Sequence, residues 1–117
     1  MNKFELIWKL HNGPKLIKEH KFHPTRRFRI DYFHESGVAI EIEGGIWLRG
    51  GGRHNRGMGY LSDMQKYNLM AERGILLFRI PASNIAASWV LPIIDTINRG
   101  GSKTYQQIQK ELQDASV

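Results

Sequence analysis

The 117-residue sequence contains no cysteine, only four prolines and no long apolar run. Without cysteine, disulfide scaffolds, thiolate metal sites and cysteine nucleophiles are excluded. A membrane-spanning helix is also excluded, because no segment approaches the roughly 18 consecutive apolar residues that it needs. The N-terminal segment is charged and lacks the apolar stretch of a secretory signal, so we expect a cytoplasmic protein. The length predicts a single domain, residues 1–117.

Acidic residues are also scarce, and their distribution is uneven. Seventeen Lys and Arg face eleven Asp and Glu, which gives a formal net charge of +6. Residues 1–29 hold eight basic side chains, and residues 44–59 combine seven of the twelve glycines with three arginines and no acid. This balance favours a polyanionic partner such as nucleic acid. The alternative is a basic protein with no nucleic-acid role.

Hydrophobic periodicity and turn residues predict an α/β fold. The expected elements are helices at 4–10 and 15–20, strands at 27–33 and 38–43, a helix at 60–73, a strand at 75–80, a helix at 83–98 interrupted at Pro92, and a helix at 104–114. The turn at 35–37 makes the first two strands antiparallel neighbours, and the third can return parallel to the second. The main order, α-β-β-α-β-α, predicts a small mixed sheet with helices on both faces.

The two adjacent strands carry a group of carboxylates. Glu41 and Glu43 are two residues apart, so they project from one face of their strand. If the strands form a hairpin, Asp31 lies across from Glu41. Carboxylates this close repel each other unless they share a positive charge, and a hard cation such as Mg²⁺ supplies it. The alternative is a solvated strand face on which Arg27 and Arg29 are the cross-strand partners.

Four segments in this order resemble small phage and bacterial nucleases of the PD-(D/E)XK superfamily. They are FHPTRRFRIDYF at 22–33, VAIEIEGG at 38–45, GRHNRGMGY at 52–60 and DMQKYN at 63–68, followed by the strand that ends at Ile80. The likeness covers about residues 14–80. It implies a restriction-endonuclease-like core, and the order of the motifs is more specific than any one of them.

The resemblance also implies roles for individual residues. Asp31 and Glu41 would ligate Mg²⁺, with Mn²⁺ as a substitute, and the backbone carbonyl of Ile42 would lie nearby. Glu19 matches an acid that such nucleases often carry on the first helix, where it binds a metal-bound water.

The sequence departs from the superfamily pattern at one position. Glu43 replaces the lysine that normally follows the second acid by two residues, a replacement that looks typical of this nuclease group. Glu43 would add a ligand or orient water. Lys66 is the candidate for the missing cation, where it would stabilise phosphate charge. The alternative is that Lys66 is a solvated lysine, because it lies off the expected apolar stripe of its helix.

The glycine-rich segment supplies the candidate nucleic-acid contacts. Glycine allows close approach of the backbone to a ligand, and arginine matches phosphate geometry. The contacts expected on DNA are Arg27, Arg49, Arg53, His54 and Arg56. Solvated loop charge is the alternative for the arginines.

The sequence thus predicts a Mg²⁺-dependent DNA endonuclease with Glu19, Asp31, Glu41, Glu43 and Lys66 as its catalytic residues. A structure-selective enzyme of phage or bacterial recombination or repair, such as a junction resolvase or nicking enzyme, fits the resemblance. The alternatives are a nucleic-acid-binding module without turnover and a nuclease subunit that needs a partner. The apolar segment 89–97 is a candidate homodimer face, and monomer and dimer both remain open.

Overall fold

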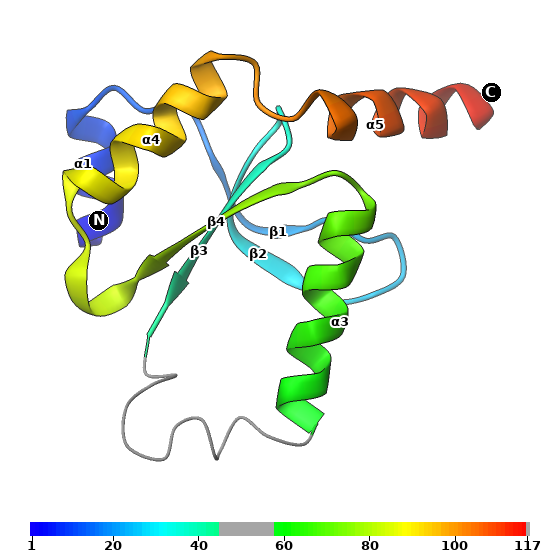
Figure 1. Cartoon of the computed structure of the whole chain (residues 1–117), viewed down its shortest axis with the longest axis horizontal. Helices are drawn as coiled ribbons and strands as arrows, with labels where there is room; N and C mark the ends of the chain where they lie inside the picture. The colour runs from blue at the N-terminus through cyan, green and yellow to red at the C-terminus, as the bar shows by residue number, and fades with distance from the viewer. Residues whose placement is uncertain (45–57, 117) are drawn as a thin grey trace.

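The computed structural model describes residues 1–44 and 58–116 as an α/β fold (Figure 1). Its elements are α1 (Lys3–Leu10), β1 (Ile17–Lys21), β2 (Arg29–His34), β3 (Val38–Glu43), α3 (Met58–Glu72), β4 (Leu76–Pro81), the short 3-10 helix η1 (Ala82–Asn84), α4 (Ala87–Asn98) and α5 (Lys103–Ala115). No helix in this part of the chain is long and apolar enough to cross a membrane.

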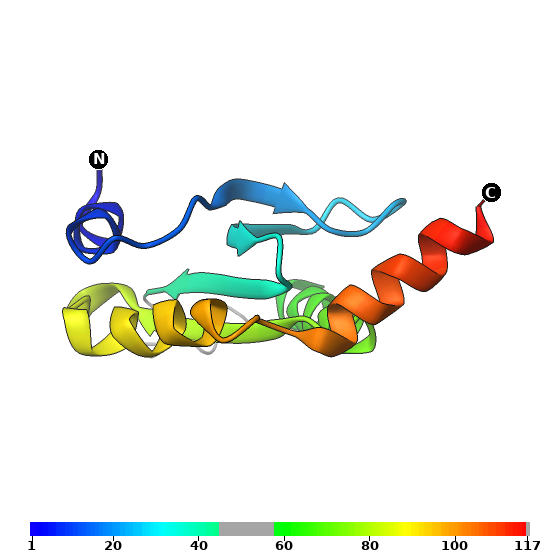
Figure 2. The same ribbon diagram turned by 90° about the horizontal axis from the view of Figure 1, so that it is seen from above.

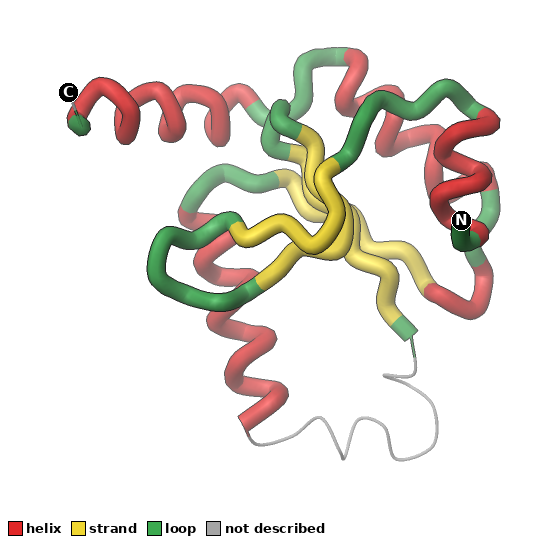
Figure 3. The backbone as a smooth tube through the Cα atoms, turned by 180° about the vertical axis from the view of Figure 1, so that it is seen from behind, coloured by secondary structure: helices red, strands yellow, loops and turns green. Residues whose placement is uncertain are grey.

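The four strands form one mixed sheet in the order β1-β2-β3-β4. β2 pairs antiparallel with both β1 and β3, and β4 pairs parallel with β3. The expected hairpin and the parallel return of the last strand are therefore confirmed. Figure 3 shows the strands twisted together at the centre with the helices around them.

The short helix expected at 15–20 is wrong, because this segment forms strand β1. Six residues gain little as an isolated helix, since helix nucleation is costly, whereas pairing with β2 satisfies their backbone groups. Glu19 consequently lies on an edge strand rather than on a helix. Its φ of 51° is in the left-handed region, so the strand is distorted at this residue.

Helices cover both faces of the sheet, as expected. On one face, α1 and α4 pack through Phe4, Trp8, Val90 and Ile93 against β3 and β4. On the other face, Met70 of α3 and Tyr105 of α5 pack against β2 and β3. Figure 2 shows α5 projecting away from the rest of the molecule.

Three helical and strand faces differ from the expected pattern. The spacing of apolar residues in 60–73 predicts a buried stripe of Tyr60, Met64, Tyr67 and Ala71. In the structure Tyr60 and Met64 are exposed, and Met70 is buried. The continuous apolar run at 75–80 predicts a buried strand, but β4 lies at the edge of the sheet and Leu76 is exposed. Four apolar residues of α4 are buried in the core, which leaves Trp89 and Leu91 as its exposed large apolar side chains.

Candidate active site

The register of the sheet places four ionisable residues in one row. Lys18 pairs with Tyr32 and His20 with Ile30, so Glu19 lies level with Asp31. Tyr32 pairs with Ile40, so the next position brings Asp31 opposite Glu41. Glu41 pairs with Arg79 on β4. The expected opposition of Asp31 and Glu41 is confirmed, and the two residues lie on the two central strands of the sheet.

The carboxylates of Asp31 and Glu41 accept hydrogen bonds from the main chain of the opposite strand, at the point where the regular β2–β3 pairing ends. The backbone N–H of Asp31 donates to Glu41 Oε2 at 2.9 Å. The backbone N–H of Ile42 donates to Asp31 Oδ2 at 2.8 Å. Each carboxylate thus accepts a main-chain hydrogen bond from the opposite strand. These two bonds fix both side chains and replace ladder bonds at this point of the sheet.

Glu41 is buried and paired with a lysine from α3. Only 5% of Glu41 is exposed. Lys66 Nζ donates to Glu41 Oε1, and the Lys66 side chain is 13% exposed. Burial raises the pKa of Glu41, although the hydrogen bonds from Lys66 and from the Asp31 N–H oppose the shift. The alternative of a solvated Lys66 is wrong, because the inward face of α3 is rotated from the expected stripe.

Glu43 points toward α3 like Glu41, as the alternation predicts, but it has different partners. Arg79 Nε donates to Glu43 Oε2 at 2.7 Å, and Arg79 Nη2 donates to Oε1 at 2.6 Å. The Tyr67 hydroxyl donates to Oε1 at 3.0 Å. Burial acts to raise the pKa of Glu43, but the bonds from Arg79 and Tyr67 outweigh it and hold the pKa below its ordinary value.

Arg79 is the residue of this site that the sequence analysis missed. It lies inside a run read as a buried strand, whereas its side chain is half exposed and carries the ion pair with Glu43. The alternative in which Arg27 and Arg29 pair with the acids is wrong. A parallel register between β3 and β4 would have been the signal, because it places Arg79 beside the two glutamates.

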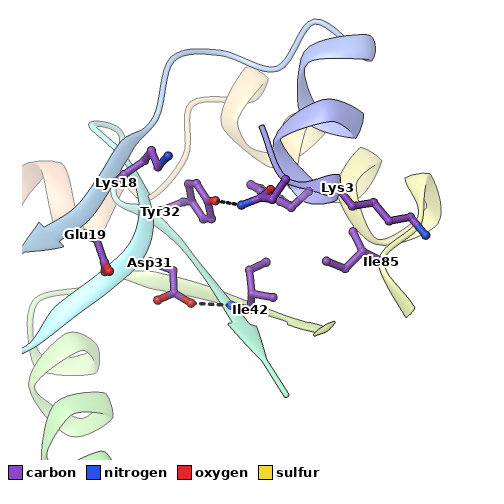
Figure 4. A pocket seen from close by; sticks show the side chains of 9 residues that line it. Lys3, Lys18, Glu19, Asp31, Tyr32, Ile42 and Ile85 are labelled. Carbon is purple, nitrogen blue, oxygen red and sulfur yellow. Dashed lines mark hydrogen bonds between the residues drawn. The ribbon is translucent and has the colours of Figure 1, made fainter. Parts of the chain in front are cut away.

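A cavity of about 310 Å³ opens beside the row on the face covered by α1 (Figure 4). Glu19 and Asp31 line it from neighbouring strands, with Ile42 at its other side. Lys3 and Lys18 bring positive charge to the same cavity. Lys18 Nζ is paired with Glu5 Oε2 at 3.0 Å, so the charge of this lysine is already compensated.

A hydrogen-bonded tyrosine forms the wall of the cavity next to Asp31. The Tyr32 hydroxyl donates to Glu5 Oε2 at 2.6 Å and accepts from Asn2 Nδ2 at 2.9 Å. Burial, followed by the bond to Glu5, raises the pKa of Tyr32 to about 12. The bond to Tyr32, followed by that from Lys18, lowers the pKa of Glu5. These contacts tie α1 to β2 beside the candidate site.

The donor atoms around Asp31 suit a hard cation. The carboxylates of Asp31 and Glu41 and the carbonyl of Ile42 offer oxygen donors, the type of ligand that Mg²⁺ prefers. Within residues 1–44 and 58–116, however, no group of three or more acidic, histidine or cysteine side chains is gathered as a metal site. Both Glu41 oxygens are hydrogen-bonded to the protein. An ion bound here would therefore share the Glu41 oxygens with the Lys66 and Asp31 donors, and it would need Asp31 and main-chain oxygen as further ligands.

The expected nucleic-acid contacts are only partly visible. Arg27 is exposed in the segment between β1 and β2. Arg49, Arg53, His54 and Arg56 lie outside the described residues.

Comparisons with known proteins give no relative for this chain. No family model matches it, and neither the curated proteins nor the solved structures contain a match.

Proposed function

We propose that the protein is a metal-dependent DNA endonuclease that hydrolyses phosphodiester bonds. This proposal rests mainly on Asp31 and Glu41, which lie opposite each other on the two central strands. Each of their carboxylates accepts a main-chain hydrogen bond from the other strand. Two carboxylates inside a sheet cost free energy through repulsion and desolvation. A site that binds a cation and a phosphate gives this costly arrangement a chemical use.

Asp31, Glu41 and the Ile42 carbonyl would hold Mg²⁺, with Mn²⁺ as a substitute. When bound, such an ion polarises the phosphoryl oxygen and lowers the pKa of a coordinated water. The three groups come from adjacent positions on β2 and β3, and hydrogen bonds between these strands restrain them. The ligands are therefore largely positioned before any ion or substrate arrives.

The other residues act through charge and orientation. Lys66 balances Glu41 and would offset charge that develops on the scissile phosphate. Glu19 lines the same cavity as Asp31 and would orient water there. Glu43 is hydrogen-bonded to Arg79 and Tyr67, whereas Glu41 accepts the N–H of Asp31, so we assign Glu43 a positioning role. Arg27 and the basic residues of segment 45–57 would hold the DNA backbone.

The element order is compatible with a restriction-endonuclease-like core. An antiparallel hairpin carries Asp31 and Glu41, and α3 then leads to a parallel fourth strand and supplies Lys66 on the way. The difference from the expected order is β1, which replaces a short helix. The proposed compartment is the cytoplasm of a bacterial or phage-infected cell, where the DNA substrate is found.

The proposal is tested by incubating labelled duplex, single-stranded and four-way-junction DNA with Mg²⁺, Mn²⁺ or EDTA. Wild type, Asp31→Asn and the exposed control Asp114→Asn are compared. We expect cleavage only with a divalent ion. Asp31→Asn should lose more than the roughly 100-fold that removal of an outer-shell partner of a metal site costs. Asp114→Asn should match the wild type.

The substrate that is cut fastest identifies the DNA structure that the enzyme prefers. Binding of DNA without cleavage under every metal condition would contradict the proposal. It would favour a binding module without turnover or a subunit that needs a partner. Cleavage that persists in Asp31→Asn would place the chemistry elsewhere in the chain.

A further inference from the structure

Two positively charged residues face each other where β1 ends and β2 begins. Lys21 and Arg29 are register partners on the two antiparallel strands, and both are exposed. Like charges directly opposite each other destabilise a strand pair. Neither side chain forms an ion pair with an acid among residues 1–44 and 58–116. This end of the ribbon therefore has a surplus of positive charge that an anion would relieve.

The Lys21–Arg29 pair lies on the same face of the sheet as the cavity. Ile30 belongs to the core cluster under α3, so Arg29 and Asp31 on either side of it point to the opposite face. His20 stacks on Phe33 at 4.3 Å, on the α3 side, which places Lys21 on the cavity side as well. Arg29 is two residues from Asp31, about 7 Å along the strand.

The segment that joins β1 to β2 is held against α3. His23 Nδ1 accepts the backbone N–H groups of Thr25 and Arg26, at 3.2 and 3.1 Å. Arg26 Nη2 donates to Gln65 Oε1 at 2.8 Å, and its guanidinium lies 4.5 Å from the centre of the Phe28 ring. Gln65 precedes Lys66 in α3. The cationic end of the ribbon is thus fixed relative to the residues around Glu41.

We propose that Lys21 and Arg29 bind the phosphate next to the scissile phosphate of a DNA strand. The inference rests on the proposed function, because it takes the Asp31–Glu41 row as the position of the scissile bond. A separation of two residues along β2 is comparable to the spacing of successive phosphates in a polynucleotide. Phosphate contacts of this kind position a strand without reading its sequence. The enzyme should therefore prefer a polynucleotide to an isolated phosphodiester.

The test is the double variant Lys21→Gln/Arg29→Gln. The matched control is Lys103→Gln/Lys110→Gln, which removes the same charge from exposed positions of α5. DNA binding is measured in EDTA over a range of salt concentrations. The slope of log affinity against log salt should fall by about one for the first variant, because one phosphate contact is lost, and not for the control. With metal, kcat/KM should fall at least tenfold more for an oligonucleotide than for bis(4-nitrophenyl) phosphate.

The two readouts separate this inference from the proposed function. A reduced salt slope in the double variant supports the phosphate site even if the wild type cuts no substrate. If the wild type cuts DNA but the double variant binds with the slope of the control, the phosphate site is overturned and the nuclease remains. Equal losses on the oligonucleotide and the small diester would also overturn it. They would show that the substitutions disturb the reacting centre instead.

Discussion

At the scale of single residues, the central feature is a buried glutamate balanced by one lysine. Glu41 is almost fully buried, and its charge is compensated by Lys66 and by the Asp31 N–H. Removal of one partner of a buried ion pair leaves an uncompensated charge, which typically costs about 3–5 kcal/mol. Lys66 therefore contributes to the stability of the fold as well as to the proposed chemistry.

We predict that Lys66→Met lowers the free energy of unfolding by about 3 kcal/mol near neutral pH. The pKa of Glu41 is already raised in the folded protein, and loss of Lys66 raises it further. A group with a raised folded pKa loses its contribution to stability as the pH rises through that pKa. The deficit should therefore be large at pH 7.5 and small at pH 4.5.

Urea unfolding of the wild type and Lys66→Met at the two pH values measures this difference. Lys110→Met, at an exposed position of α5, is the control. The same deficit at both pH values would contradict the assignment of Glu41 as the group that Lys66 compensates.

The alternation of side chains along the strands explains which parts of the site the sequence could predict. The two-residue alternation of β3 is enough to put Glu41 and Glu43 on one face, and a tight hairpin then brings Asp31 opposite Glu41. The alternation alone cannot distinguish the role of Glu41 from that of Glu43. Their difference arises from Lys66 and Arg79, which depend on the rotation of α3 and the register of β4. Both are tertiary features without a local sequence signal.

At the scale of secondary-structure elements, long periodic segments were predictable and short ones were not. The expected positions of β3, α4 and α5 agree with the structure to within a few residues. β1 was missed because five residues carry too little periodicity to distinguish a strand from a helix. Its formation depends on β2, and the left-handed backbone of Glu19 is a distortion that no local pattern indicates.

The β2–β3 turn offers a test at this scale. Gly37 has a φ of 95°, and a Cβ there would lie 2.6 Å from the Tyr105 side chain of α5. Gly37→Ala should therefore destabilise the protein by about 2–4 kcal/mol, through backbone strain and overpacking together. Chemical denaturation followed by circular dichroism measures the effect.

Gly59→Ala is the matched control for this prediction. Gly59 lies in α3, and a Cβ there would meet no atom within 4 Å. The substitution should leave stability unchanged or raise it by up to about 1 kcal/mol, because alanine favours the helix. If Gly37→Ala were as mild as this control, the tight packing of Gly37 against Tyr105 of α5 would be contradicted.

At the scale of the whole molecule, the fold brings acidic and basic groups together around one row of the sheet. The net charge is +6, yet three acids and Arg79 occupy one row across the sheet. Lys3 and Lys18 flank the cavity next to this row, and Lys21 and Arg29 lie beyond it on the same face. On this face a DNA strand would meet Glu19 and Asp31 beside these basic residues, whereas Glu41 points to the face covered by α3. Composition alone predicts the polyanionic partner but not this arrangement, which requires the sheet register.

The central claim is most directly tested by the rate of DNA cleavage in Mg²⁺ for wild type, Glu41→Gln and Glu72→Gln. Glu72 is exposed at the end of α3, so its variant controls for the loss of one acid. We predict that Glu41→Gln folds, still binds DNA and loses more than the roughly 100-fold in rate that loss of an outer-shell partner of a metal site costs. Glu72→Gln should cleave like the wild type. A folded Glu41→Gln that cleaves at the wild-type rate would contradict the account.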